Sequence, residues 1–327
     1  MGMVVNGRWT EEPPAETGSS GEFRRIASAF RNRITADGSS GYPAVAGRYH
    51  LYVGYHCPWA HRTIMFRALK KLEHAISISY CLPYFRENGW TFELRPETPD
   101  CTLDQINGFH YLYQAYTKAD PTYTGKVTIP VLWDKQTSKI VNNESSEIIR
   151  MFNSEFAGIA GNDTDYYPAS LRAKIDEVNE FIYANVNNGV YRCGFARSQA
   201  AYEEAYDALF AALDQLEARL AKQRYLVGEQ QTEADWRLFP TLVRFDVAYF
   251  SIFKCNRQRL SDFPNLWRYT CDLYATPGIA ATVKPRLYVQ NYYSIERVNP
   301  LGIIPRGTPV DFGTVPAAAP PRVAHSA

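Results

Sequence analysis

A cysteine placed between a short apolar strand and a helix constrains this chain more than any other feature. The pattern from Tyr49 to Gly54 predicts a strand, and the stretch from Thr63 to Leu72 predicts a helix. Pro58 suits the first turn of that helix, where its missing N–H is not needed. The sulfur of Cys57 is then expected to meet the free N–H groups and the positive end of the helix, which favour the nucleophilic thiolate over the thiol.

The residues after Cys57 indicate how a disulfide on this thiol would be resolved. Trp59 and Ala60 fill the last two places of what would otherwise be a C-P-x-C motif, so the second cysteine is missing. A mixed disulfide on Cys57 must then be resolved by an external thiol. We therefore expect a small-molecule thiol as co-substrate. The six cysteines and the histidines show no metal-ligand spacing, and no metal is expected.

The predicted elements around Cys57 form a mixed α/β unit. Strand patterns and one helical pattern follow the first helix, in this order: strands 75–82, 127–133 and 139–141, and a helix over 144–156. Residues 83–125 are long, aromatic and irregular, and are interpreted as an insertion. The order β-α-β-insertion-β-β-α fits a compact sheet with strands in mixed directions.

The second half of the chain is predicted to be all-helical. Helical patterns cover residues 198–222 and 264–274, another helix opens at a capping box formed by Thr232 and Asp235, and a last one is expected to start at Pro277.

These patterns divide the chain into five parts. We expect an N-terminal arm over 1–45, with a short amphipathic helix from Phe23 to Ile34, and an α/β domain over 46–157. A linker over 158–170, an all-helical domain over 171–298 and a tail over 299–327 follow; the tail is expected to wrap loosely or to be disordered.

Two further motifs suggest what the thiol acts with. Pro130 lies inside an apolar strand, where it is either an edge proline or part of a cis peptide that turns the backbone of Ile129 outward, to pair with a peptide-like ligand. Ser145 either caps the following helix or, with that helix N-terminus, binds a carboxylate, and Glu144 beside it is able to take an ammonium group. A carboxylate and an ammonium together describe the γ-glutamyl end of glutathione.

Five blocks of the chain, in this order and spacing, resemble the Xi-class glutathione transferases, the glutathionyl-hydroquinone reductases. The blocks are 57–62, 128–134, 142–147, 186–195 and 232–238. The resemblance implies a thioredoxin-like α/β N-terminal domain and an all-α C-terminal domain, which is the glutathione-transferase architecture. It also implies a homodimer that reduces glutathionyl-hydroquinones with a second glutathione, giving the hydroquinone and glutathione disulfide.

The resemblance assigns roles to particular residues. Cys57 is the nucleophile that forms a mixed disulfide with glutathione, and three tyrosines face the hydroquinone hydroxyls: Tyr191, Tyr249 and Tyr292. Glutathione is held by Trp90, Lys126, Ile129, Glu144 and Ser145. Lys126 stands where the family often has Arg, and a lysine lacks the planar fork that binds a carboxylate with two hydrogen bonds.

Charge and hydropathy exclude several other functions. With 35 basic and 34 acidic residues the formal net charge is +1, so no strong field exists for nucleic acid or an anionic membrane. No apolar run reaches the roughly 20 residues of a membrane span, and the start lacks the order of a secretory signal. Scattered single cysteines then favour the reducing cytoplasm.

Three other functions remain open at this point. They are a transferase that conjugates glutathione to an electrophile, an omega-like thioltransferase or dehydroascorbate reductase, and a non-catalytic binding protein with a transferase fold. A cysteine at the catalytic place argues against the first, because it would form a disulfide with glutathione.

Overall fold

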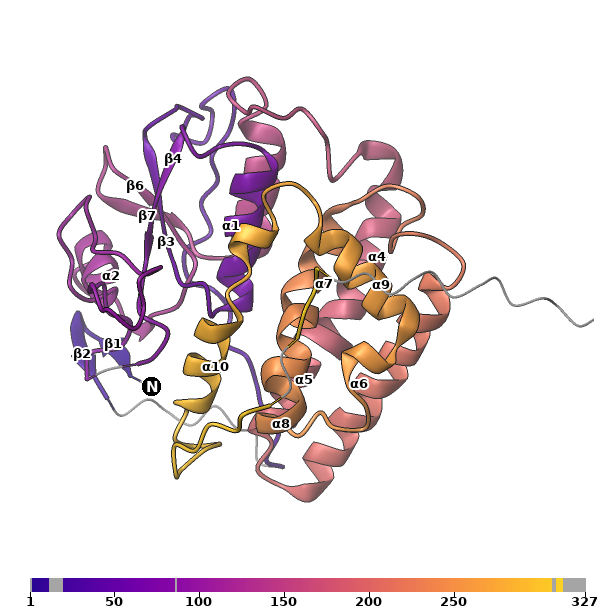
Figure 1. Cartoon of the computed structure of the whole chain (residues 1–327). Coiled ribbons are helices and arrows are strands. Elements are labelled where there is room, and N and C mark those ends of the chain that lie inside the picture. The colour runs from indigo at the N-terminus through magenta and orange to yellow at the C-terminus, as the bar shows by residue number, and fades with distance from the viewer. Residues whose placement is uncertain (1, 12–19, 86, 308–309, 314–327) are drawn as a thin grey trace, which may run out of the picture.

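The computed structural model describes residues 2–11, 20–85, 87–307 and 310–313. It contains a thioredoxin-like lobe built on a four-stranded sheet and a second lobe of helices (Figure 1). The expected combination of an α/β lobe and an all-helical lobe is confirmed. Helix α1 of the first lobe packs against α7 of the second, and α10 runs along the boundary between them (Figure 1).

The main sheet is mixed, with strand order β4-β3-β6-β7. Strand β3 (Tyr49–Val53) pairs in parallel with β4 (Ile76–Tyr80) and antiparallel with β6 (Val131–Asp134), which pairs antiparallel with β7 (Lys139–Asn142). All five residues of β3 are buried, because this central strand is covered on both faces. The buried end of β3 thereby fixes the position of the loop that carries Cys57.

Two helices pack against this sheet and start next to one another. Helix α1 (Pro58–Leu69) follows β3, and α3 (Ser145–Arg150) follows β7 and continues as a π-helical turn (Met151–Glu155). Pro58 occupies the first helical turn, as predicted. Because α1 and α3 contact each other, the N-terminal ends of both helices are available to the same ligand.

The N-terminal arm adds a small second sheet. Strands β1 (Met3–Val5), β2 (Arg8–Thr10) and β5 (Gly125–Lys126) form an antiparallel sheet in the order β2-β1-β5. The arm is therefore joined to the end of the insertion, in which helix α2 (Tyr113–Ala119) lies.

The predicted helix at Phe23–Ile34 is wrong, because the chain there is extended and its apolar residues go to different places. Phe23 packs on Tyr191 and Phe195 of the helical lobe. Ile34 is buried against the first lobe, whereas Ile26 is 57% exposed. The helical spacing of these residues is satisfied by contacts with two different lobes rather than by one face of a helix.

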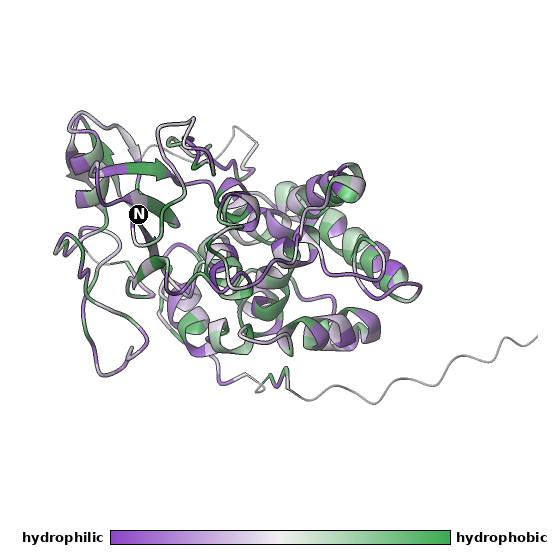
Figure 2. Ribbon diagram, turned by 90° about the horizontal axis from the view of Figure 1, so that it is seen from above, coloured by the Kyte–Doolittle hydropathy of each residue, from purple (hydrophilic) through white to green (hydrophobic). Residues whose placement is uncertain are grey.

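The second lobe consists of helices joined by short loops and π-helical turns. Its α-helices are α4 (Arg172–Ile182), α5 (Gly189–Phe195), α6 (Gln199–Leu220), α7 (Glu233–Arg244), α8 (Phe250–Ile252), α9 (Pro264–Tyr274) and α10 (Pro285–Tyr293). π-Helical turns at Tyr183–Asn187 and Phe245–Tyr249 precede α5 and α8, and short 3-10 turns lie at Ala169–Leu171, Leu260–Asp262 and Ala280–Thr282. Purple and green alternate around these helices in Figure 2, as expected of helices with one buried face.

Local sequence signals in this lobe are mostly confirmed. The capping box of Thr232 and Asp235 is present at the start of α7, and Ser198 caps α6. The helix expected at Pro277 is wrong: Gly278 has a φ of +86°, a turn follows, and the last helix starts at Pro285. The strand predicted over 127–133 begins only at Val131, after the cis peptide between Ile129 and Pro130.

The tail is partly packed. Phe312 is buried against the rings of Trp267 and Tyr274, so residues 310–313 do not wrap loosely. Residues 314–327 lie outside the described part of the chain. None of the described helices combines the length and apolar character needed to cross a bilayer.

Candidate functional site

Cys57 is the N-cap residue of α1. Its sulfur accepts a hydrogen bond from the backbone N–H of Ala60 at 3.5 Å and lies 3.6 Å from the carbonyl oxygen of Ile129, to which the thiol donates. The residue is partly exposed. The thiol therefore sits where strand β3, helix α1 and the loop before β6 meet, with a helix N-terminus on one side.

The N–H groups at the helix start act on Cys57 in the predicted direction, but they do not lower the pKa of its thiol overall. Burial raises the pKa of the Cys57 thiol, and this effect outweighs the N–H groups of Ala60 and Trp59 and the charges of Arg244 and Arg25, which act in the opposite direction. Formation of the thiolate consequently depends on the positive charges that the surrounding protein keeps next to the sulfur.

The backbone of Ile129 and the ring of Trp90 lie on two sides of the cysteine loop. Ile129 is buried and joined to Pro130 by a cis peptide bond, as the sequence suggested. Trp90, also buried, stacks on the imidazole of His56 with ring centres 4.5 Å apart. Since His56 precedes Cys57, Trp90 is brought to the wall of the thiol site.

Glu144 and Ser145 form the N-terminus of α3. The Glu144 carboxylate accepts from the N–H and the hydroxyl of Ser146, at 3.1 and 2.9 Å, and from Ser28 at 3.0 Å. Burial alone would raise the pKa of Glu144, but these bonds and the charge of Arg62 lower it. The hydroxyl of Ser145 accepts from Arg62 at 3.5 Å. A carboxylate thus lies beside the free N–H groups of a helix start. This arrangement suits an α-amino acid, whose ammonium the carboxylate binds and whose carboxylate the N–H groups bind.

Lys126 ends strand β5, on the small sheet that the arm completes. Burial, and next the nearby charge of Arg297, lower the pKa of Lys126 to about 8. The lysine is therefore a cation that loses its proton just above neutral pH.

The three predicted tyrosines meet although they come from three different helical segments. Tyr191 lies in α5, Tyr249 in the π-helical turn before α8, and Tyr292 in α10. The hydroxyl of Tyr292 is 2.8 Å from that of Tyr191 and 2.7 Å from that of Tyr249. Tyr292 thus joins the other two into one chain of hydroxyls.

This chain has one hydrogen to spare. Three hydroxyls carry three hydrogens, and two are used in the bonds between them. Burial raises the pKa of all three phenols, so they stay protonated at neutral pH. Tyr249 is fully buried, whereas Tyr191 is partly exposed and close enough to Cys57 for a thiolate charge to raise the pKa of Tyr191. When Tyr249 donates to Tyr292 and Tyr292 donates to Tyr191, the spare hydrogen lies on Tyr191, at the end of the chain beside the sulfur.

Sequence reasoning missed two arginines at this site. Arg25, from the arm, stacks its guanidinium on the rings of Trp59 and Tyr191, at 4.5 and 4.8 Å from their centres, and donates to Asn188. Arg244 is buried at the end of α7. The only sequence signal for Arg244 is a charged residue within the apolar stretch from Leu242 to Phe245; nothing in the sequence placed the arm over the thiol.

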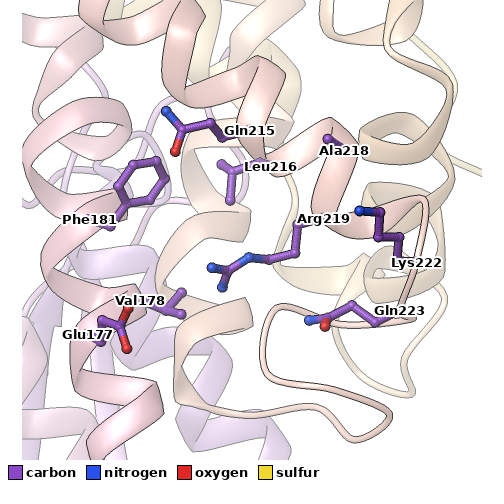
Figure 3. Close-up of a pocket in the computed structure, with 9 residues that line it drawn as sticks. All are labelled: Glu177, Val178, Phe181, Gln215, Leu216, Ala218, Arg219, Lys222 and Gln223. Carbon is purple, nitrogen blue, oxygen red and sulfur yellow. The ribbon is translucent and has the colours of Figure 1, made fainter.

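A separate groove lies on the helical lobe, between α4 and α6. It has a volume of about 540 Å³ and is lined by long polar side chains and a few apolar ones: Glu177, Val178, Phe181, Gln215, Leu216, Ala218, Arg219, Lys222 and Gln223 (Figure 3). No predicted site residue lines it. A much smaller hollow, at the boundary between the lobes, is lined by Trp59, Arg62 and Asn187.

Two family models match the chain in the order of its lobes. Residues 56–155 match the model for the glutathione S-transferase N-terminal domain, and residues 199–270 match the model for the C-terminal domain. The first match contains Cys57, Ile129, Glu144 and Ser145.

Full-length relatives agree with these matches. The chain is 48% identical to glutathionyl-hydroquinone reductase YqjG of Escherichia coli, over 96% of this chain and 100% of that protein. It is 50% identical to glutathionyl-hydroquinone reductase PcpF of Sphingobium chlorophenolicum, over 94% and 96% of the two chains. Among solved structures, a Xi-class transferase from Natrialba magadii superposes with a TM-score of 0.90, at 46% identity and over 97% and 96% of the two chains.

Proposed function

The chain belongs to the Xi-class glutathione transferases, the glutathionyl-hydroquinone reductases, and on that premise we propose that it uses glutathione to reduce glutathionyl-hydroquinones to free hydroquinones. One observation carries the proposal: a thiol at a helix N-terminus and a chain of protonated tyrosine hydroxyls face the same place at the lobe boundary. The thiol is the group that accepts the glutathionyl group of the substrate, and the hydroxyls are the groups that hydrogen-bond to the oxygen of its ring.

In the first half-reaction Cys57 takes over the glutathionyl group. The bond between glutathione sulfur and ring carbon is weak only in the keto tautomer of the substrate, where that carbon is sp³. The Cys57 thiolate attacks the glutathione sulfur, the C–S bond breaks, and its electron pair leaves with the ring as an enolate. The former C–S carbon keeps the hydrogen that it gained when the keto tautomer formed, and the enolate oxygen takes up one proton to give the hydroquinone. The ring is thereby reduced, and the two sulfurs are oxidised to a mixed disulfide.

In the second half-reaction an external glutathione resolves that disulfide. Its thiolate attacks the glutathione sulfur of the mixed disulfide, glutathione disulfide leaves, and the Cys57 thiolate is restored. Glu144 and Ser145 are proposed to hold the γ-glutamyl ammonium and carboxylate. The Ile129 backbone, Trp90 and Lys126 are proposed to hold the rest of the tripeptide.

The tyrosine chain is proposed to stabilise the developing enolate. Tyr191, Tyr249 and Tyr292 deliver one hydrogen bond to that oxyanion from a chain that is already ordered, so little reorganisation is needed. We further propose that the enzyme works as a homodimer in the cytoplasm. The cytoplasmic location agrees with the six cysteines, which are all free thiols.

Mass spectrometry with one equivalent of a glutathionyl-hydroquinone and no free glutathione tests the first half-reaction. We expect one glutathione added to the Cys57 peptide and an equal amount of hydroquinone released. Adding glutathione should then remove the adduct and give glutathione disulfide. Cys57→Ser is the control and should give neither product.

Other results would point to the alternatives. An unmodified protein that joins glutathione to an electrophile would indicate a conjugating transferase. Rapid turnover of dehydroascorbate or small mixed disulfides, without release of hydroquinone, would indicate a thioltransferase. Either result contradicts the proposal.

A further inference from the structure

Arg244 is a fully buried cation that is held directly behind the cysteine loop. Its guanidinium donates to the carbonyl oxygens of Tyr55 at 2.6 Å and of His56 at 3.1 Å, the two residues before Cys57. A third hydrogen bond, of 2.7 Å, goes to the carbonyl oxygen of Pro240 one turn earlier in α7. The side chain thus ties the end of α7 to the backbone that leads into the thiol.

The remaining neighbours of Arg244 are neutral as well. His61 in α1 lies 3.1 Å away through Nδ1, which must accept because a guanidinium only donates. Its Nε2–H then donates to Thr282, and burial together with the charge of Arg244 lowers the pKa of His61 well below its usual range. The guanidinium carbon of Arg244 lies over the ring of Tyr288, 3.8 Å from the ring centre.

No carboxylate balances this charge among the residues that the structure describes. By contrast, buried Arg48, just before β3, forms a 2.6 Å ion pair with Asp134 at the end of β6. Burying a cation without a counter-charge is unfavourable, even when its hydrogen bonds are made. Unbalanced buried charges of this kind are concentrated at functional sites.

The groups that become anionic in the proposed reaction lie around this cation. Cys57 follows the carbonyls that Arg244 holds, and the positive charge of Arg244 favours the thiolate. The same charge acts on Tyr191, Tyr249 and Tyr292, whose hydroxyl chain receives the substrate oxyanion.

We propose that Arg244 is a positioning residue of the thiol site. It fixes the backbone before Cys57 and supplies the buried positive charge that balances first the thiolate and then the enolate at the tyrosines. The role in the second step rests on the proposed function, whereas the role in forming the thiolate does not.

Other titratable groups also lie near the sulfur of Cys57, and a test of Arg244 must leave them unchanged. Arg25 approaches from the arm and Tyr191 from α5, and buried Cys81 follows β4. His56 is buried and uncharged at neutral pH, because burial lowers its pKa to about 3. Arg244 and Arg25 are therefore the two charges whose removal should change the titration of Cys57.

The test is the pH dependence of Cys57 alkylation by iodoacetamide, followed by mass spectrometry of the Cys57 peptide. In Arg244→Met the midpoint should move up by about one pH unit, which lowers the rate at neutral pH about tenfold. Arg48→Met is the matched control: it removes another buried arginine, one that lies away from Cys57, and should lower the melting temperature without moving the midpoint. A folded Arg244→Met protein with the parental midpoint would overturn the proposal.

Arg244→Lys keeps the test decisive if the methionine variant does not fold. Lysine keeps the charge but lacks the planar fork whose three nitrogens reach the three carbonyls, so we expect an alkylation rate about threefold lower at neutral pH. An unchanged profile in this variant counts against the positioning role. Because iodoacetamide requires neither glutathione nor a hydroquinone, these results are independent of whether the proposed function is correct.

Discussion

The two halves of the candidate site are built in opposite ways. The thiol half consists of Cys57, Ile129, Glu144 and Ser145, and uses the starts of two helices and one turn of backbone. The tyrosine half consists of Tyr191, Tyr249 and Tyr292, whose positions depend entirely on how three helical segments pack. Each part of the first half has a local geometric cause, whereas the second half depends on tertiary packing alone.

Because of this difference, we expect the two halves to respond differently to side-chain substitutions. In the thiol half the hydrogen-bond donors are backbone N–H groups, which a side-chain substitution does not remove. In the tyrosine half each hydroxyl is held only by the next one, so a single deletion leaves its partners unsatisfied in a buried place. Variants in the two halves should therefore fail in different kinetic parameters.

The largest effect is expected from Cys57→Ser, which should lower kcat for glutathionyl-hydroquinone reduction by at least about 1,000-fold. Binding of glutathione, measured by calorimetry, should stay within a factor of about three, since the helix ends and Ile129 are unchanged. The control Cys271→Ser, in α9, should keep parental turnover. Substantial turnover by the Cys57 variant would mean that the thiol half is not the reacting half.

Tyr292→Phe is the sharpest test of the tyrosine half, because Tyr292 makes both bonds of the hydroxyl chain. We expect kcat for hydroquinone conjugates to fall about 100-fold, the range found when one oxyanion donor is lost, with little change in glutathione KM. Tyr293→Phe is the matched control from the next position of α10. If both variants behave alike, the hydroxyl chain is only packing.

Among the residues proposed to bind glutathione, Lys126 should make the affinity for glutathione depend on pH. Its pKa of about 8 means that it is charged below that pH and neutral above it. A bound glutathione carboxylate would raise the pKa further, so KM for glutathione should rise about three- to tenfold as the pH increases through 8 and beyond. Lys126→Arg should abolish this dependence, because arginine stays charged. A parallel rise in both enzymes would assign the pH effect to another group.

The contrast between local and tertiary geometry also explains what could be predicted from the sequence. The strand before Cys57, the helix after Pro58 and the capping box at Thr232 depend on neighbouring residues, and the structure has all of them. The cis peptide at Pro130 was suggested for the same reason.

Features that depend on distant contacts were missed. The arm from Phe23 to Ile34 has helical spacing, but Phe23 binds one lobe and Ile34 the other, and this tertiary contact overrides the local pattern. Arg244 meets Tyr55 and His56 across almost 190 positions, with separations of 189 and 188. The tyrosines were named only through a family resemblance, since nothing in their local sequence distinguishes them from packing residues.

The smallest effect is expected where the arm touches the thiol half. Ser28 donates to the Glu144 carboxylate at 3.0 Å and so occupies one of the acceptors proposed for the glutathione ammonium. Ser28→Ala removes this competitor, and since one hydrogen bond contributes about 0.5–1.5 kcal/mol net, glutathione KM should fall about two- to threefold with kcat unchanged. Ser39→Ala is the control, because that hydroxyl bonds only with Asp37 and Thr35 of the arm. A rise in KM would instead mean that Ser28 holds Glu144 in its binding position, which would make the arm part of the thiol half.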